Sequence, residues 1–82
     1  MLEVEIYISL KKTVSDPQGL AIKHALDSLH FGGIEEVRMG KLIIIRLDTK
    51  NKKEARETID TMCRKVLANP IIEDYHFKIK EL

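Results

Sequence analysis

The side chains of this chain that could carry out chemistry are few, and their spacing does not favour a catalytic site. The three histidines are His24, His30 and His76. They fall on a predicted helix, at the end of that helix and on a predicted strand, so no two have the spacing of metal ligands on one element. We expect all three to be ordinary surface residues.

A carboxylate near an imidazole and a lone thiol are the remaining candidates. Asp74 and His76 lie two residues apart, so they share one face of a predicted strand and could form an acid–base or metal-binding pair. Solvated strand charges are the commoner case, and we adopt that interpretation. Cys63 lies beside Met62 on an apolar helical stripe, where a free thiol usually packs as a small hydrophobe. The sequence therefore predicts no catalytic residue, no metal site and no cofactor site in this chain.

Charge and glycine patterns give no support for nucleotide, nucleic-acid or membrane binding. The chain has no Walker sequence and no G-x-G-x-x-G, and we expect Gly32 and Gly33 to end a helix. Fourteen Lys and Arg residues against thirteen Asp and Glu leave a net charge of +1, too balanced for a broad basic surface. RNA-recognition domains stack bases on aromatics of their central strands, where this chain offers only Tyr7. One cysteine and no secretory signal pattern favour the cytoplasm.

The first half of the chain predicts a strand followed by a helix. Apolar residues alternate with polar ones over residues 2–10, as in a half-buried strand. Asp16 can cap a helix whose first residue is Pro17, and the helix runs to about Leu29. The apolar stripe that we expect to face the sheet consists of Ala21, Ile22, Ala25, Leu26 and Leu29.

The second half predicts a hairpin, a second helix and a last strand. Residues 35–39 form a weak edge strand, Gly40 and Lys41 a two-residue turn, and residues 42–47 a more buried strand. Asn51 and Glu54 resemble a capping box for a helix that ends at about Leu67. Pro70 then separates this helix from a strand with apolar residues on alternate positions.

These elements predict one α+β domain over residues 1–82, with the order βαββαβ. The antiparallel sheet has two helices on one face, in a ferredoxin-like order. Its other face is uncovered and carries Tyr7, together with either Leu42 and Ile44 or the alternate set Ile43, Ile45 and Leu47. Because soluble monomers rarely expose large apolar areas, we predict a homodimer or a larger assembly such as a tetramer.

Four sequence blocks, in order along nearly the whole chain, resemble the PurS family. The first is Asp16-Pro17-Gln18-Gly19, and the second runs from Ala21 through Ala25-Leu26 to Leu29. The third is Val37-Arg38-Met39-Gly40-Lys41, and the fourth runs from Met62-Cys63 through Leu67-Ala68-Asn69-Pro70-Ile71-Ile72-Glu73-Asp74-Tyr75. Any one of these blocks would be weak evidence, but together they are specific.

The resemblance implies a non-catalytic subunit of a larger enzyme. PurS is the small subunit of phosphoribosylformylglycinamidine (FGAM) synthase, which converts formylglycinamide ribonucleotide to its amidine with ATP and glutamine in purine biosynthesis. In that family the large PurL subunit holds ATP and magnesium, PurQ releases ammonia from glutamine, and PurS joins the two and supports ammonia transfer. PurS has no active site of its own, but it is a required subunit of this glutamine-dependent ligase.

Candidate interface residues come from the matching blocks and, for Tyr7, from the uncovered sheet face. We expect them to be Tyr7, Gly19, Arg38, Gly40, Lys41, Asn69, Glu73 and Tyr75. Glycine in a first helical turn costs about 1 kcal/mol relative to alanine, so Gly19 suggests a closely approaching backbone. Arg38, Gly40 and Lys41 form the tip of the predicted hairpin, where a partner could dock. Asn69 could cap the last carbonyls of the second helix, and Glu73 and Tyr75 could face a second protomer or PurL.

Two other classes of protein share this order of elements. A small-molecule regulatory module of the ACT type also dimerises, but it needs a glycine-rich loop after the first strand, and residues 11–16 contain no glycine. A stand-alone enzyme with a ferredoxin-like fold needs converging titratable groups, and the predicted elements bring none together.

Overall fold

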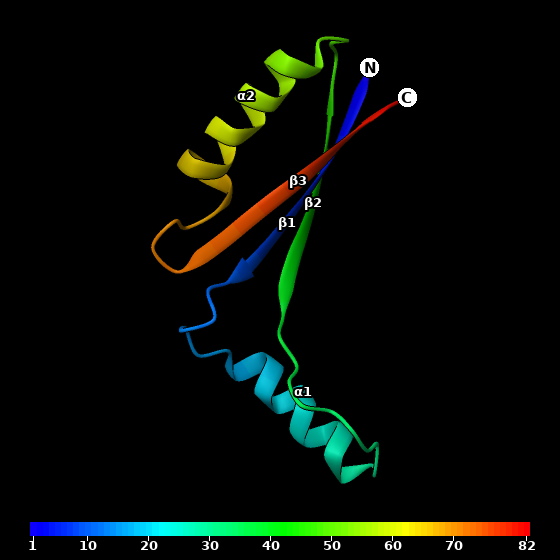
Figure 1. The fold of residues 1–82 in the computed structure, drawn as a ribbon, viewed down its shortest axis with the longest axis vertical. Coiled ribbons are helices and arrows are strands. Elements are labelled where there is room, and N and C mark those ends of the chain that lie inside the picture. The colour runs from blue at the N-terminus through cyan, green and yellow to red at the C-terminus, as the bar shows by residue number, and fades with distance from the viewer.

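The computed structural model describes residues 1–82 as an antiparallel sheet with two helices (Figure 1). The strands are β1 (Leu2–Leu10), β2 (Gly40–Leu47) and β3 (Glu73–Glu81). The helices are α1 (Pro17–Ser28) and α2 (Lys52–Met62), and α2 continues into a π-helical turn, η1 (Cys63–Leu67). The predicted α+β class is confirmed.

The central position of β1 follows from its strongly alternating sequence. The strand order is β2-β1-β3, and both neighbours run antiparallel to β1. Val4 lies opposite Ile45 of β2 and Ile79 of β3. Since side chains alternate across a strand, the even-numbered residues of β1 and these two partners share one face of the sheet.

That face is covered by α2 and η1, and the contact forms the core. Val4 and Ile6 of β1 and Ile59 of α2 are fully buried. Cys63 is also fully buried, and burial raises the pKa of its thiol. The prediction that this cysteine packs as a small hydrophobe is confirmed, and a thiol in this state is a poor nucleophile.

The predicted strand over residues 35–39 and the hairpin turn at Gly40 are wrong. The chain does not reverse at Gly40 but runs straight on, so that residues 34–39 form an extended segment outside the sheet (Figure 1). The backbone amide of Met39 donates to the side chain of Asp16 instead of to a neighbouring strand. Local alternation in the sequence predicted an extended conformation correctly, but it could not predict the partner.

Helix α1 also lies elsewhere than predicted. It extends beyond the end of the sheet beside residues 34–39, and together they form an arm, defined here as residues 17–39 (Figure 1). Of the predicted apolar stripe only Leu26 is half-buried, while Ile22 is 38% and Leu29 68% exposed. Within one chain, therefore, only α2 and η1 cover the sheet.

The arm makes the molecule long and thin. Its extents are 48 × 28 × 15 Å and its radius of gyration is 16.2 Å, against about 12 Å for a compact chain of this length. The two termini meet at the end of the sheet away from the arm, where the amide of Leu82 donates to the carbonyl of Met1 at 3.1 Å (Figure 1). No helix is long and apolar enough to span a bilayer.

Candidate subunit interface

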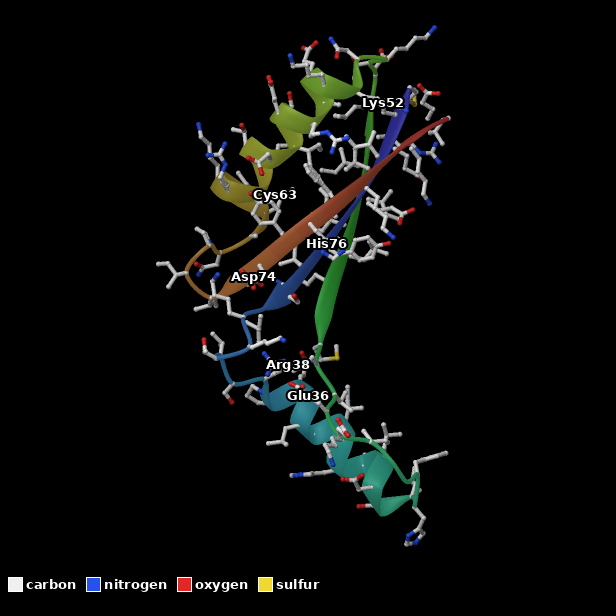
Figure 2. All side chains as sticks on the ribbon, in the orientation of Figure 1. Glu36, Arg38, Lys52, Cys63, Asp74 and His76 are labelled. Atoms are coloured by element: carbon white, nitrogen blue, oxygen red, sulfur yellow. The ribbon has the colours of Figure 1, made fainter.

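Three of the four sequence blocks that resemble the PurS family meet at the end of the sheet from which the arm departs. There β1 ends, β2 and β3 begin, and α1 starts (Figure 1). We call this region the neck, and its residues are Lys11, Asp16, Gly19, Arg38, Met39, Gly40, Lys41, Asn69, Glu73 and Asp74. Figure 2 labels Arg38 and Asp74, one on each side of the neck.

Asp16 joins the two chain segments that cross the neck. As predicted, it caps α1, because its Oδ1 accepts a hydrogen bond from the amide of Gly19 at 3.0 Å. Its Oδ2 accepts a second bond, from the amide of Met39 at 2.6 Å. These two bonds, with the nearby guanidinium of Arg38, lower the pKa of the buried Asp16 carboxyl below its usual value.

Gly19 is required by a close backbone approach. A Cβ atom built on Gly19 would lie 2.3 Å from the carbonyl oxygen of Val37. The predicted reason for a glycine in this helical turn is therefore confirmed. The approaching backbone belongs to the same chain, which makes this contact part of the arm itself.

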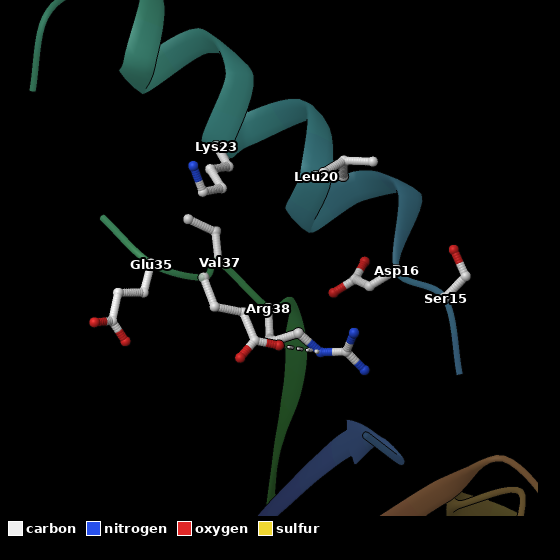
Figure 3. Close-up of a pocket in the computed structure, with 8 residues that line it drawn as sticks. Ser15, Asp16, Leu20, Lys23, Glu35, Val37 and Arg38 are labelled. Carbon is white, nitrogen blue, oxygen red and sulfur yellow. Dashed lines mark ion pairs between the residues drawn. The ribbon is translucent and has the colours of Figure 1, made fainter. Parts of the chain in front are cut away.

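Arg38 holds the arm to the rest of the molecule. Its Nη2 donates to the carbonyls of Lys11 and Val14, both at 3.0 Å. Its Nε lies 3.7 Å from Glu36, as the dashed line in Figure 3 marks. The sequence placed Arg38 at an exposed hairpin tip, and this prediction is wrong, because its guanidinium binds backbone carbonyls of the same chain. Lys41, by contrast, has a side chain that is 68% exposed, with its Nζ 3.7 Å from Glu73, and it is free to contact a partner.

A hollow lies between α1 and residues 35–38. It has a volume of about 270 Å³ and is lined mainly by polar side chains (Figure 3). Lys23 on its wall pairs with Asp27 at 2.8 Å, and Asp16 is engaged as described above. Of the titratable side chains that line the hollow, only Glu35 makes no hydrogen bond or ion pair, and no second free titratable group lies in the hollow beside it.

Asn69 and Glu73 close the turn between η1 and β3. The side chain of Glu73 accepts from the amide of Asn69 at 2.7 Å, and Oδ1 of Asn69 accepts from the amide of Ile71 at 3.1 Å. Asn69 thus shapes its own turn, and the expectation that its side chain caps the carbonyls of α2 is wrong. Its backbone carbonyl also accepts from the amides of Ile72 and Glu73.

Tyr75 is held against α2. Its hydroxyl donates to Oδ1 of Asp60 at 2.6 Å, and this bond, with partial burial, raises the pKa of Tyr75. The polar groups of Glu73 and Tyr75 are therefore satisfied within the chain. An additional contact of either residue with a partner remains a prediction.

The uncovered sheet face carries a polar cluster and a short apolar strip. Tyr7 stacks on His76 with ring centroids 4.9 Å apart, and its hydroxyl donates to Glu5 at 2.7 Å. Of the two sets that the sequence left open, Leu42 and Ile44 lie on this face and are 54% and 56% exposed. His76 stacks on Tyr7, and Asp74 pairs with Lys11 at 2.7 Å, so the two residues do not form the acid–base pair that we considered and rejected from the sequence.

Sequence reasoning missed three contacts at the neck. It did not find the bond from Met39 to Asp16, the bonds from Arg38 to two carbonyls, or the bond from the amide of Lys11 to the carbonyl of Ile72 at 2.8 Å. Each joins residues far apart in the chain. The one sign of these contacts in the sequence was Gly19. A glycine in the first turn of a helix lowers helix stability, and its presence suggested that another backbone segment passes close to the start of α1.

Comparison with known proteins identifies the family that the chain resembles. The family model PurS, described as phosphoribosylformylglycinamidine (FGAM) synthase, matches residues 3–81. The FGAM synthase subunit PurS of Bacillus subtilis is 39% identical over 82 residues, covering 100% of this chain and 96% of the relative.

Solved structures agree with this match. The structure of Methanocaldococcus jannaschii PurS, a subunit of formylglycinamide ribonucleotide amidotransferase in the purine biosynthetic pathway, superimposes with a TM-score of 0.90 at 38% identity. It covers 100% of this chain and 99% of that one. A chain in the structure of PurLQS from Thermotoga maritima gives a TM-score of 0.85 at 26% identity, covering 98% and 99% of the two chains.

Proposed function

This chain belongs to the PurS family of FGAM synthase subunits, and we propose that it joins the synthetase PurL to the glutaminase PurQ so that ammonia passes between them. It is a subunit of the FGAM synthase complex of purine biosynthesis, which contains PurL and PurQ. The observation that carries the assignment is the family match over residues 3–81. The ACT-type alternative is not favoured.

A non-catalytic role is consistent with the polar side chains of the neck, which are hydrogen-bonded to backbone groups of the same chain. Asp16 and Arg38 bind backbone groups of the neck, and the carboxylate of Glu73 closes a turn. Groups engaged in this way give shape and are not available for proton transfer. We therefore place ATP and magnesium on PurL and no cofactor on this chain. A buried free thiol at Cys63 is consistent with the reducing cytoplasm.

We further propose that the chain acts as a homodimer. A compact chain of this mass exposes about 5,000 Å² of surface, whereas this chain exposes 6184 Å². The excess of about 1,100 Å² is similar to the area, about 800 Å² per partner, that a standard protein interface buries. A second copy that covers the arm would remove this excess.

The arms suit an exchange between the two copies. In a ferredoxin-like sheet the second strand pairs with the outer edge of the third, and the first helix packs beside the second. Here the corresponding edge of β2 is unpaired, and Ile43, Ile45 and Leu47 on the α2 side of the sheet are only half-buried. We infer that residues 34–39 and α1 of each copy fill these positions on its partner. Two exchanged dimers could then associate into a tetramer.

Pairing through the uncovered sheet face is the weaker arrangement. At its centre Glu5 pairs with Lys80 and accepts from Tyr7, so a partner there would have to desolvate charged groups. The exchanged arm meets aliphatic side chains instead.

Reconstitution tests the proposed subunit role. This chain is mixed with PurL and PurQ from the same source, and glutamine-dependent formation of the amidine is measured. We expect activity only when all three are present, while ammonia-dependent turnover by PurL alone shows whether this chain also supports the synthetase step. An unchanged glutamine-dependent rate without this chain would contradict the proposal.

A further inference from the structure

We propose that Arg38 and Asp16 form a lock that fixes the direction of the arm, and so prepares each chain for exchange with its partner. This inference rests on the homodimer proposed above. Neither the family match nor the dimer itself requires Arg38 and Asp16 to fix the direction of the arm. We call these residues, with the backbone groups that they bind, the neck lock.

The neck lock begins at a fixed point of the sheet. The amide of Lys11 donates to the carbonyl of Ile72 at 2.8 Å, and its Nζ pairs with Asp74 at 2.7 Å. Lys11 is thus anchored to the start of β3 by backbone and side chain. Its carbonyl is a rigid acceptor just beyond the end of β1.

Arg38 ties the arm to this fixed point. One nitrogen of its guanidinium donates to the carbonyl of Lys11 and to that of Val14, both at 3.0 Å. These bonds join the segment that leaves the sheet after β1 to the segment that returns before β2. Bonds to a charged donor are stronger than those between neutral groups.

Asp16 makes the second tie between the same two segments. Its carboxylate accepts from the amide of Met39 at 2.6 Å and from the amide of Gly19 at 3.0 Å. The start of α1 is therefore joined to the residue next to Arg38. The arm leaves the sheet as two crosslinked chain segments, not as a flexible single strand.

The lock disfavours the folded-back monomer. In that form the chain would reverse at Gly40 and lay residues 34–39 along the outer edge of β2. Arg38 would then move away from the carbonyl of Lys11, which stays with the sheet. Breaking the lock frees the arm to take many directions, and ordering it again on dimerisation costs conformational entropy.

The test compares dimer dissociation constants by analytical ultracentrifugation. Arg38→Ala should raise the constant about tenfold, since a net hydrogen bond from a charged group is lost. Lys52→Ala is the control, because Lys52 is 51% exposed, pairs with Glu81 of β3 at 3.6 Å and lies at the end of the sheet opposite the neck, away from the edge of β2. It should leave the constant within about twofold of the wild type, since exposed ion pairs contribute little.

A second variant keeps the test decisive if Arg38→Ala does not fold. Arg38→Lys retains a positive charge but not the guanidinium, and we expect its dissociation constant to lie between those of the wild type and Arg38→Ala. A folded Arg38 variant that dimerises as tightly as the wild type overturns the lock. A wild type that stays monomeric at 100 μM, roughly the concentration at which weak dimers form, overturns the homodimer instead, so the two failures are distinguishable.

Discussion

A single carboxylate determines how the arm begins. Asp16 accepts from Gly19 within the arm and from Met39 where the arm ends, and the surrounding backbone buries it. Because both bonds use charged oxygens, Asp16 must be ionised to make them. The geometry of the neck therefore depends on the charge of one residue.

Gly19→Ala should destabilise the protein by about 1–3 kcal/mol, because the new methyl group would lie 2.3 Å from the carbonyl of Val37 and the arm would have to shift. The gain in helix propensity offsets only part of this. Gly32→Ala is the control, since a Cβ there meets no atom within 4 Å. Urea unfolding followed by circular dichroism measures both, and equal midpoints for the two variants would contradict the steric explanation.

Asp16 should also give the protein a characteristic acid sensitivity. Its folded-state pKa is lowered, chiefly by the amide of Gly19 and then by that of Met39, relative to an unfolded value of about 4. The stabilisation is therefore complete above pH 4 or so and is lost as the pH falls through the folded-state pKa. Urea midpoints between pH 6 and pH 2 should fall more steeply for the wild type than for Asp16→Asn.

The control for this experiment is Asp48→Asn, which removes a carboxylate that lies in the loop after β2 and outside the neck. Its acid profile should follow that of the wild type. If Asp16→Asn were equally steep, the acid sensitivity would have to come from other carboxylates.

Residue roles could be predicted where the reason is local. The cap at Asp16 and the close approach at Gly19 follow from rules about a single helical turn. The role of Arg38 could not be predicted, because the carbonyls that it binds are 27 and 24 residues away in the chain. A charged residue beside a turn is ordinarily solvated, and its sequence neighbours gave no sign of this contact.

At the scale of elements, the main feature is the straight passage from residues 34–39 into β2. The sequence predicts a turn at Gly40, and the structure replaces it with a continuous extended chain. A Cβ on Gly40 would lie 3.1 Å from the carbonyl of Ile8, so this glycine serves close strand packing and not chain reversal. The same residues can therefore act as a hinge between two arrangements.

Lengthening this hinge should convert the proposed dimer to a monomer. Inserting Asn-Gly between Gly40 and Lys41 supplies the residues that two-residue hairpins favour, so each arm could fold back onto its own β2. Light scattering after size-exclusion chromatography should show half the wild-type mass. Circular dichroism should show unchanged helix content. A matched Ala-Ala insertion, which does not favour a tight turn, should remain largely dimeric.

Elements with a partner in the same chain were predicted well, and the arm was not. The apolar alternation of β1 and the stripe of α2 pack against each other, and so the pattern and the structure agree. The stripe of α1 is also apolar, but a periodic pattern does not indicate what the stripe packs against. For the same reason the predicted ferredoxin-like arrangement is incomplete within one chain.

At the scale of the whole molecule, the core of one chain is small. Only 10 of 82 residues are buried, and most of them belong to the contact of β1 with α2 and η1. A chain of this size is already marginal as an independent fold. Stability should therefore depend on assembly.

The melting temperature should rise with protein concentration. When unfolding and dissociation are coupled, a 100-fold increase in concentration favours the folded dimer, and for a protein of this size the rise is roughly 8 °C. Melting curves recorded by circular dichroism at about 1 μM and about 100 μM protein measure this rise in melting temperature. The monomeric Asn-Gly insertion variant is the control and should melt at the same temperature at both concentrations.

The two termini lie together and provide a site at which a tag can be attached. Because Met1 and Leu82 are hydrogen-bonded at the end of the sheet opposite the neck, an affinity tag or fluorophore attached to either one stands clear of the arm of its own chain. Protein immobilised through this end would present Lys41 and the rest of the neck outward. Surface-based binding measurements with PurL and PurQ can then be made without a label at the contacts under study.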